Sequence, residues 1–317
     1  MVTAPQLSVG IDLGGTKISA VLMDADGRVL SRRRTATPRG DYAATVGTVA
    51  EMARFDGGDG AENGAETGIA MPGSLTRENR IQNANSTWLN GRLFGDDLAA
   101  AMERPVRLAN DADCFALSEW TDGAAAGAAS VFGVILGTGC GGGLIVGGRL
   151  AGGPNATGGE WGHVPLPRPD AAERAHPPCW CGRQGCMESF VSGPALEADF
   201  ARTAGRALSA AEIAASATRG DGEARDALER HAGRVARGLS LVVNIADPEV
   251  IVLGGGLSAM DHLYAELPGL IRPHVFADDP VVDIRRPVHG DDSGVRGAAR
   301  LWREGGGTAF HPSGHPG

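Results

Sequence analysis

The amino-acid sequence predicts an α/β fold of two lobes. A buried strand, a Gly/Thr-rich turn and a second strand follow one another near the N-terminus, and the same unit returns about 125 residues later. Helical spacing separates these β-rich units and dominates residues 194–246. A chain of 317 residues is long enough for two domains with their own cores, or for one large domain. We interpret the repeated unit as an internal duplication with one copy in each lobe.

The first unit predicts a strand at 7–11 (LSVGI), a turn at 12–17 (DLGGTK) and a second strand at 18–23 (ISAVLM), which ends in a hairpin turn at 24–27. Because a strand follows the glycines, this turn differs from a Walker loop or a dinucleotide fingerprint, both of which open a helix. Glycines in such a turn let backbone N–H groups approach phosphate oxygens. A plain tight hairpin explains the stretch equally well when it is taken alone.

The second unit predicts a strand at 131–136 (VFGVIL), a glycine turn at 137–143 (GTGCGGG) and a further strand from 144 that ends in a Gly-Gly turn. Two phosphate-holding hairpins that face each other across a cleft would clamp a polyphosphate from both sides. A third glycine turn, 254–256, follows the strand 250–253, at the carboxyl end where α/β sheets bind ligands.

Between the two units, residues 41–56 have helical spacing with Asp41 as the cap, and 67–70 predict a short strand. Amides, hydroxyls and one indole then follow at 83–90 (NANSTWLN). This mixture of donors, acceptors and an apolar face suits a ligand that carries hydroxyl groups. An ordinary loop with Asx turns is the alternative.

A strand at 106–109 leads into Asn110 and Asp111, which open a helix that runs through Trp120. At a strand end and a helix N-terminus, Asp111 would stay ionised and could act as a general base. The alternative makes Asp111 or Asp113 the N-cap of the helix.

The segment 158–188 contains one histidine and three cysteines at the spacing H-x15-C-x-C-x4-C. His163, Cys179, Cys181 and Cys186 suit a closed tetrahedral zinc site, which would supply folding energy to a Gly/Pro-rich loop that includes Pro177 and Pro178. Three inert buried thiols and a core histidine are the alternative. Glutamates at both ends of the segment, Glu160 and Glu188, would present acceptors to a polyhydroxylated ligand unless they are solvated surface side chains.

Composition excludes several classes of protein. Lys and Arg total 29 against 38 Asp and Glu, a net charge of −9, so we expect no nucleic acid and no anionic membrane surface as a partner. A stretch of about eighteen apolar residues and a signal peptide are both missing from the sequence, which predicts a cytoplasmic protein. Of the five cysteines, Cys114 and Cys140 remain as free thiols. We assign the helices of 194–246 to core packing and expect a final helix at 294–302.

With these motifs the chain resembles the ROK family of bacterial sugar kinases and repressors, which has the two-lobed actin/hexokinase-like ATPase fold. The resemblance covers nearly all of residues 7–302. It is carried by DLGGTK, the AND of 109–111, GTGCGGG, GGEWGH, CWCGRQGCME, VLGGGLS and GVRGAA. The stretches NANSTWLNG, ILGTGC and HGDDSGVRGAARLW are most similar to the bacterial fructokinases or manno(fructo)kinases. N-acetylglucosamine kinases of the family share the zinc loop and glycine turns but not the STW patch.

The resemblance implies a role for each motif. Asp111 corresponds to the catalytic base that takes the proton of the primary hydroxyl of the sugar, and Asp12 to the acidic residue associated with Mg2+. The implied sugar contacts are Asn85, Asn110, Asp111, Glu160, His163 and Glu188. The implied ligands of a structural Zn2+ are His163, Cys179, Cys181 and Cys186. The positions implied for ATP are Gly10, Asp12, Gly14, Gly15, Thr16, Lys17, Gly137, Thr138, Gly139 and Gly141 at the phosphates, and Gly254, Gly255 and Gly256 on the adenosine side.

The activity that the resemblance implies is ATP-dependent phosphorylation of fructose to fructose 6-phosphate. N-acetylglucosamine, glucose and mannose are the alternative substrates, because a few hydrogen bonds of about 1–3 kcal/mol decide among hexoses. A sugar-responsive repressor is the alternative of another class. Such repressors carry a helix-turn-helix domain before the first strand, whereas six residues precede Leu7 here and the net charge is acidic.

The resemblance also implies domain bounds. We expect a small lobe at 1–117, completed by a C-terminal helix at 290–303, and a large lobe at 118–289 that carries the second phosphate turn and the zinc loop. The tail 304–317 has five glycines and two prolines and is expected to be disordered. A homodimer is the expected assembly.

Overall fold

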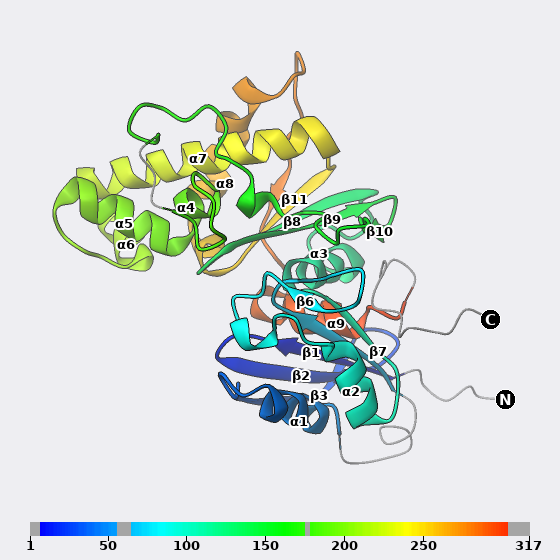
Figure 1. Ribbon diagram of the computed structural model, residues 1–317. Helices are drawn as coiled ribbons and strands as arrows, with labels where there is room; N and C mark the ends of the chain where they lie inside the picture. The colour runs from blue at the N-terminus through cyan, green and yellow to red at the C-terminus, as the bar shows by residue number, and fades with distance from the viewer. Residues whose placement is uncertain (1–6, 56–64, 175–177, 304–317) are drawn as a thin grey trace. The chain divides into compact units, whose positions relative to one another are not determined.

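The computed structural model describes residues 7–55, 65–174 and 178–303 (Figure 1). By internal packing, these residues divide into two compact units. The first unit comprises the chain up to Gly127, the segment Gly143–Gly158 and the chain from Asp291 onward. The second unit comprises Ala128–Gly142 and Gly159–Gly290. The expected tail at 304–317 and Pro177 lie outside the described residues.

A five-stranded sheet forms the centre of the first unit, in the order β3-β2-β1-β4-β7. β1 and β2 form an antiparallel hairpin that β3 extends, and β1, β4 and β7 are parallel to one another. The carboxyl ends of these three parallel strands therefore lie at one edge of the sheet. The strands are β1 (Ser8–Leu13), β2 (Lys17–Met23), β3 (Val29–Ala36), β4 (Glu66–Met71) and β7 (Val106–Asn110).

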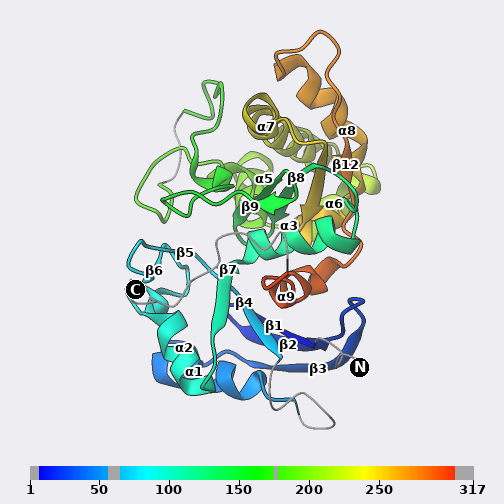
Figure 2. The same ribbon diagram turned by 90° about the vertical axis from the view of Figure 1, so that its right-hand side faces the viewer.

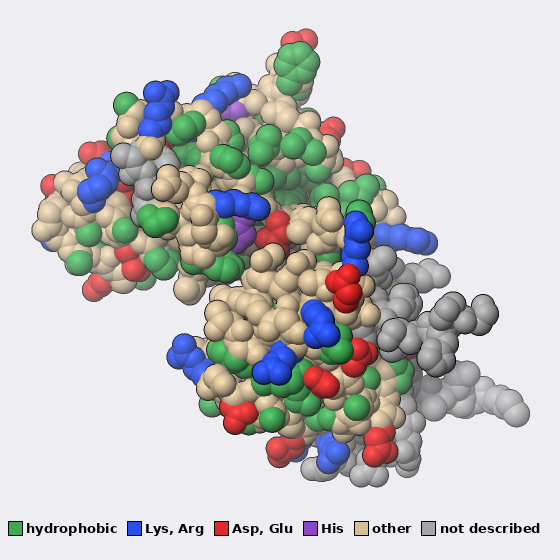
Figure 3. All heavy atoms as spheres, viewed as in Figure 1, with side chains coloured by type: hydrophobic (Ala, Val, Ile, Leu, Met, Phe, Trp, Pro, Cys, Tyr) green, Lys and Arg blue, Asp and Glu red, His purple; other side chains and the backbone are tan. Residues whose placement is uncertain are grey.

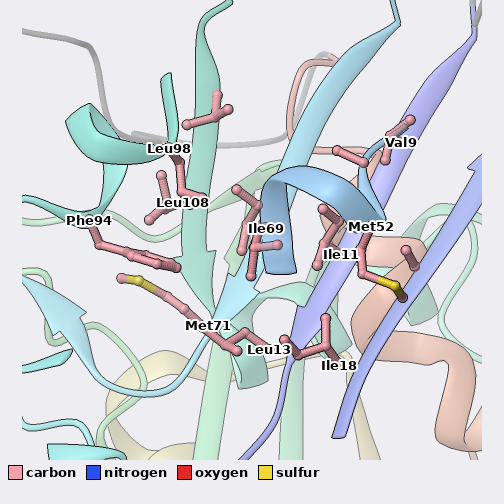
Figure 4. Close-up of a cluster of buried hydrophobic side chains, with 14 of the residues drawn as sticks. Val9, Ile11, Leu13, Ile18, Met52, Ile69, Met71, Phe94, Leu98 and Leu108 are labelled. Atoms are coloured by element: carbon pink, nitrogen blue, oxygen red, sulfur yellow. The ribbon is translucent and has the colours of Figure 1, made fainter. Parts of the chain in front are cut away.

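Alternation along the strands directs side chains to two different helix layers. Val9, Ile11 and Leu13 of β1 belong to a buried cluster with side chains of α1 and α2 (Figure 4). The opposite face of the sheet packs against α9, and α9 also lies beside α3 (Figure 2). The helices are α1 (Tyr42–Met52), α2 (Phe94–Met102), α3 (Asp111–Asp122) and α9 (Ser293–Ala299).

Glycines let α9 approach the sheet and α3 at backbone distance. A Cβ added to Gly10 would lie 2.0 Å from the carbonyl oxygen of Val295, and one added to Gly68 would lie 1.9 Å from that of Ala298. On the other side of the helix, a Cβ at Gly297 would lie 1.8 Å from the carbonyl oxygen of Cys114. Real Cβ atoms do not come this close to backbone oxygens, so these positions require glycine.

The second unit is built on β8, β11 and β12, which are parallel, and on the start of β9. They belong to another sheet, of order β10-β9-β8-β11-β12, whose strand β10 lies in the segment Gly143–Gly158 of the first unit. β9 begins in this unit and runs on into the first one after Gly142. The strands are β8 (Ser130–Leu136), β9 (Cys140–Val146), β10 (Arg149–Leu150), β11 (Val250–Gly254) and β12 (Ile284–Arg285). The helices are α4 (Glu188–Val191), α5 (Gly193–Ala204), α6 (Ala210–Thr218), α7 (Gly222–Ala246) and α8 (Asp261–Ile271).

The local structure confirms most of the predicted elements. Asp41 caps α1 by accepting a hydrogen bond from the backbone N–H of Ala44, and the hairpin of β1 and β2 encloses the first glycine turn. Along α7 the apolar stripe is fully buried at Val235 and Leu239 and half-buried at Val242. Among the described residues, no helix is both long and apolar enough to cross a membrane.

Some predicted boundaries were wrong. α1 ends at Met52 rather than at 56, and α9 ends at Ala299 rather than at 302. The second glycine turn ends at Gly139 rather than Gly143, because β9 already begins at Cys140. Gly142 is a strand residue whose added Cβ would lie 2.6 Å from the Phe132 ring, so its glycine serves close packing. The N-cap of α3 is Asn110, not Asp111 or Asp113, because Asn110 keeps extended backbone angles and its side chain accepts from the N–H of Ala112.

Candidate functional site

In the first unit, Asn110 and Asp111 lie where β7 ends and α3 begins. The amide of Asn110 is held on both sides, since its Oδ1 accepts from the N–H of Ala112 at 2.8 Å and its Nδ2 donates to the carbonyl of Gly73 at 2.9 Å. The side chain of Asp111 also accepts from Ala112 and is exposed. The carboxylate is therefore accessible to a ligand, as a general base must be.

The first glycine turn is fixed from outside by Thr37. Its hydroxyl donates to the carbonyl of Gly14 at 2.7 Å, and its N–H donates to the carbonyl of Thr16 at 3.0 Å. Within the turn, the N–H of Gly14 donates to the carbonyl of Lys17. Gly15, Thr16 and Lys17 remain exposed, as a phosphate-binding turn requires.

Asp12 lies beside this turn on the sheet face that packs against α9. An added Cβ on Gly294 would lie 3.4 Å from its carboxylate. Burial raises the pKa of Asp12 to about 6, although the positive charges of Lys17 and Arg34 oppose the shift. A carboxylate oxygen beside an exposed glycine turn is the kind of ligand that Mg2+ takes, so the residues fit that ion.

The polar patch at 83–90 is used mostly by the protein itself. Trp88 donates through Nε1 to the Thr45 hydroxyl at 3.2 Å. The Asn90 amide accepts from the N–H of Ala84 at 2.9 Å and donates to its carbonyl at 3.0 Å. Asn85 is exposed and is the member of the patch that we keep as a sugar-contact candidate.

In the second unit, the chain brings together the four predicted zinc ligands, with one donor atom from each lying within 4.8 Å of the others. The sulfurs of Cys181 and Cys186 are 3.6 Å apart, and the Cys179 sulfur lies 3.6 Å from Nδ1 of His163. A tetrahedral zinc ion with Zn–S bonds of about 2.3 Å separates its sulfur ligands by about 3.8 Å. The donor set and spacing therefore fit Zn2+.

Short backbone pairings shape the loop around this cluster. Isolated bridges pair Pro165 with Cys186 and Pro178 with Gln184, and the N–H of Cys179 donates to the carbonyl of Arg183 at 2.7 Å. Gly182 takes a φ of +85°, which glycine adopts without strain. These turns direct the three sulfurs to one point.

A buried ion-pair network anchors the same loop to α7. The Glu173 carboxylate accepts from Arg234 at 2.9 Å and from Arg237 at 2.6 Å, and Arg234 reaches Asp199 of α5 at 3.3 Å. Burial alone would raise the pKa of Glu173, but hydrogen bonds from Arg237, the Asp170 backbone and Arg234 lower it to about 2. The sequence does not single out this network, because its members are scattered among many other charged residues.

Glu160 and Glu188 precede and follow the four cluster residues along the chain. Glu188 accepts through Oε2 from the N–H of Cys140 at 2.9 Å, and through Oε1 from Nε1 of Trp180. Burial raises the pKa of Glu160; His163 opposes this shift and Glu188 adds to it. The two carboxylates and the imidazole therefore interact electrostatically, and the carboxylates are acceptors that suit hydroxyl-rich ligands.

A cavity of about 930 Å³ opens beside the second and third glycine turns. It is lined by Gly137 and Thr138 from the second turn and by Gly256 and Leu257 from the third. Its volume is within the range of small-molecule sites, about 300–1,000 Å³. The helices of 194–246, which we had assigned to core packing alone, also line it. Its further lining residues, which sequence analysis missed, include Glu197, Ser209, Arg225, His262 and Glu266.

The third glycine turn packs closely against the end of β8, which explains why it contains glycine. Gly255 has a φ of +77°, and an added Cβ would lie 2.4 Å from the carbonyl oxygen of Leu136, at the end of β8. The N–H of Gly193 donates to the carbonyl of Gly137 at 2.8 Å, which brings the start of α5 to the second turn. The two turns and α5 thus form one wall of the cavity.

Comparison with known proteins agrees with this arrangement. The model of the ROK family matches residues 8–305. The chain belongs to the ROK family. It is 37% identical over 302 residues to the N-acetyl-D-glucosamine kinase of Yersinia enterocolitica, covering 92% of this chain and 98% of the relative. It is 35% identical over 294 residues to the N-acetylgalactosamine kinase AgaK of Shewanella, covering 92% and 95%.

Among solved structures, the ROK hexokinase of Thermus thermophilus is similar over 93% of this chain and 97% of its own, with 33% identity and a TM-score of 0.80. The prediction of an α/β fold of the actin/hexokinase-like class is thereby confirmed. The expected closer resemblance to fructokinases receives no such support, because the curated relatives described above are kinases of N-acetylated hexosamines.

Proposed function

We propose that this ROK-family protein is an ATP-dependent sugar kinase that phosphorylates N-acetylglucosamine on its primary hydroxyl. The observation that carries this proposal is the similarity, over nearly the whole of both chains, to enzymes named N-acetyl-D-glucosamine kinase. The same family membership and the glycine turns support ATP as the phosphoryl donor.

In this proposal, Asp111 accepts the proton of the attacking hydroxyl. Phosphoryl transfer depends mostly on positioning and charge neutralisation, so little further covalent chemistry is required of the protein. The turn at Gly14–Lys17 and the turn at Gly137–Gly139 hold the phosphates, and the cavity beside Gly254–Gly256 receives the nucleoside. Mg2+, held near Asp12, supplies charge neutralisation when bound.

Glu160 and Glu188 accept hydrogen bonds from the sugar hydroxyls. The further sugar contacts are His163, Asn85 and Asn110. Zn2+ on His163 and the three cysteines has a structural role, because four protein ligands leave no open coordination position. The ion would order the loop between Glu160 and Glu188, and it would take no part in the chemistry. As a cytoplasmic homodimer, the protein would need only the hexose and ATP as partners.

Fructose is the second candidate substrate. The stretch NANSTWLNG favours it, by its resemblance to fructokinases. The internal hydrogen bonds of Trp88 and Asn90 weaken that indication, because these side chains serve the local fold whatever the sugar is. Glucose and mannose rank below both.

A regulatory role without catalysis has less support. On the face shown in Figure 3, basic and acidic side chains of the described residues are interspersed and form no continuous basic surface. The net charge of −9 also disfavours DNA. A gel-shift experiment with genomic DNA fragments should give no retarded band.

The deciding experiment is a coupled ATP-consumption assay with Mg2+ across N-acetylglucosamine, N-acetylgalactosamine, fructose, mannose and glucose. We expect the highest kcat/KM for N-acetylglucosamine. A preference for fructose would overturn the substrate while leaving the kinase, and it would return weight to the 83–90 patch. Absence of turnover with all five sugars would overturn the proposed activity.

A further inference from the structure

Trp180 is an exposed indole in the middle of the metal-type cluster. It stands between Cys179 and Cys181, and 57% of its surface is exposed. Its two neighbours supply donor atoms to the cluster, and the indole supplies none. Neither core packing nor metal binding therefore explains a large aromatic side chain at this position.

Two contacts hold the indole in one orientation. Its Nε1 donates to Oε1 of Glu188, and its ring meets the His163 ring edge-on, with centroids 5.2 Å apart and planes at 82°. In the proposed function, Glu188 is one of the acceptors assigned to the sugar and His163 is one of the further sugar contacts. Exposure alone does not distinguish Trp180, because Phe276 is even more exposed. The difference is that the Phe276 side chain can form no hydrogen bond.

The contacts of Glu188 show what the indole contributes. Its Oε2 accepts from the N–H of Cys140 at 2.9 Å, and its Oε1 accepts from Trp180. One donor on each oxygen fixes the plane of the carboxylate and leaves further lone pairs for ligand hydroxyls. A carboxylate held by a single donor could rotate, and its remaining acceptor directions would no longer be defined.

We propose that Trp180 is a positioning residue of the sugar site, which orients Glu188 through Nε1 and offers its exposed ring face as an apolar wall for the hexose. Hexoses present C–H groups as well as hydroxyls, and an indole with one apolar face and one donor serves both. This inference rests on the proposed function, because it takes the ligand of Glu188 to be a sugar.

The test uses sugar binding and kinetics together. Addition of the preferred hexose should change the tryptophan fluorescence of the wild-type protein, and Trp180→Phe should lose most of that change. Trp180→Phe keeps a ring but loses the donor to a charged acceptor, so we expect the KM for sugar to rise about 10-fold, with kcat changed by less than about 3-fold. Trp180→Ala should raise the KM further, because the wall is also lost.

Trp302→Phe is the matched control. Trp302 also donates through Nε1, to the carbonyl of Thr67 at 2.8 Å, but it belongs to the first unit and has no part in the proposed site. This variant should keep both the fluorescence change and the wild-type KM. Zinc content and thermal midpoint, measured on every variant, separate loss of positioning from loss of folding.

A wild-type KM in both Trp180 variants, with the fluorescence change retained in Trp180→Phe, would overturn the inference. So would an equal loss in Trp302→Phe. Failure of the proposed function looks different, because the wild-type protein itself would then turn over none of the hexoses.

Discussion

The carboxylate of Glu188 accepts a hydrogen bond from the backbone N–H of Cys140 over 2.9 Å. This contact joins the first residue of α4, two positions after Cys186, to the first residue of β9, directly after the second glycine turn. The approach is close enough that a Cβ on Gly139 would lie 2.8 Å from the same carboxylate oxygen. A proposed sugar acceptor therefore contacts the backbone directly after a proposed phosphate turn.

Glu188→Gln should weaken the binding of both the sugar and ATP. Cys140 and Trp180 are both donors to Glu188, whereas an amide has one acceptor oxygen, so one of the two contacts must be lost. We expect the KM values for sugar and for ATP each to rise about 10-fold in steady-state kinetics. A rise confined to the sugar would show that the carboxylate does not support the phosphate turn.

Asp111→Asn should abolish turnover and leave sugar binding intact, because the amide keeps the shape of the side chain but cannot take a proton. We expect kcat to fall by at least about 100-fold. Asp113→Asn, two positions later on α3, is the control and should lose far less. Titration calorimetry with the sugar would check binding, and near-normal turnover in Asp111→Asn would contradict its role as the base.

Metal analysis should find about one zinc ion per chain in protein purified without a chelator. Removing it should lower the thermal midpoint and the activity, because the loop would lose the energy that orders it. Cys181→Ser should lose the metal, whereas Cys114→Ala should retain it, since Cys114 lies outside the cluster. Zinc-free wild-type protein of unchanged stability would contradict a structural metal.

Glu173→Gln should lower the free energy of unfolding by about 3 kcal/mol, because it leaves Arg234 buried with only part of its pairing. The wild-type carboxylate, with its pKa lowered to about 2, contributes stability above its ordinary value near 4.5. That contribution is lost as the pH falls from about 4.5 towards 2. Urea unfolding across this window should therefore show a shallower acid decline in the variant, and parallel curves would contradict the assignment.

Gly297→Ala should destabilise the first unit by about 3 kcal/mol or more, since its Cβ would meet the carbonyl oxygen of Cys114 at 1.8 Å. Gly47→Ala is the matched control in α1 of the same unit. Nothing lies within 4 Å of its added Cβ, and alanine there should stabilise the helix by about 1 kcal/mol. Thermal unfolding of both variants gives the comparison, and similar midpoints would refute the close approach of α9 and α3.

Local sequence patterns predicted most of the strands and the metal cluster. Alternation and glycine turns identify β1, β2 and β8, because both depend on residues next to one another in the chain. Cysteines grouped within eight residues of a loop predict their own convergence. The motif around Asp111 likewise located β7 and α3 to within a residue or two.

Features that depend on distant segments could not be predicted in this way. The N-cap is Asn110 because β7 keeps its extended backbone geometry for one residue beyond the apolar residues that predicted the strand. The contribution of α5, α6 and α8 to the cavity, and the pairing of Glu173 with α7, arise only after the chain has folded back on itself. Trp180 carries no periodicity, and its contact with Glu188 becomes visible only when the loop has closed.

The close approach of α9 to the sheet has a consequence for biosynthesis. The strand glycine Gly10 is covered by Val295, which follows it by 285 residues. At about 5–20 residues per second on the ribosome, one face of the first sheet waits roughly 15 to 60 s for the helix that covers it. The nascent chain must keep this face from associating with other chains throughout that interval. Changes in α9 should therefore reduce the yield of folded protein in the cell more severely than they alter the activity of the molecules that do fold.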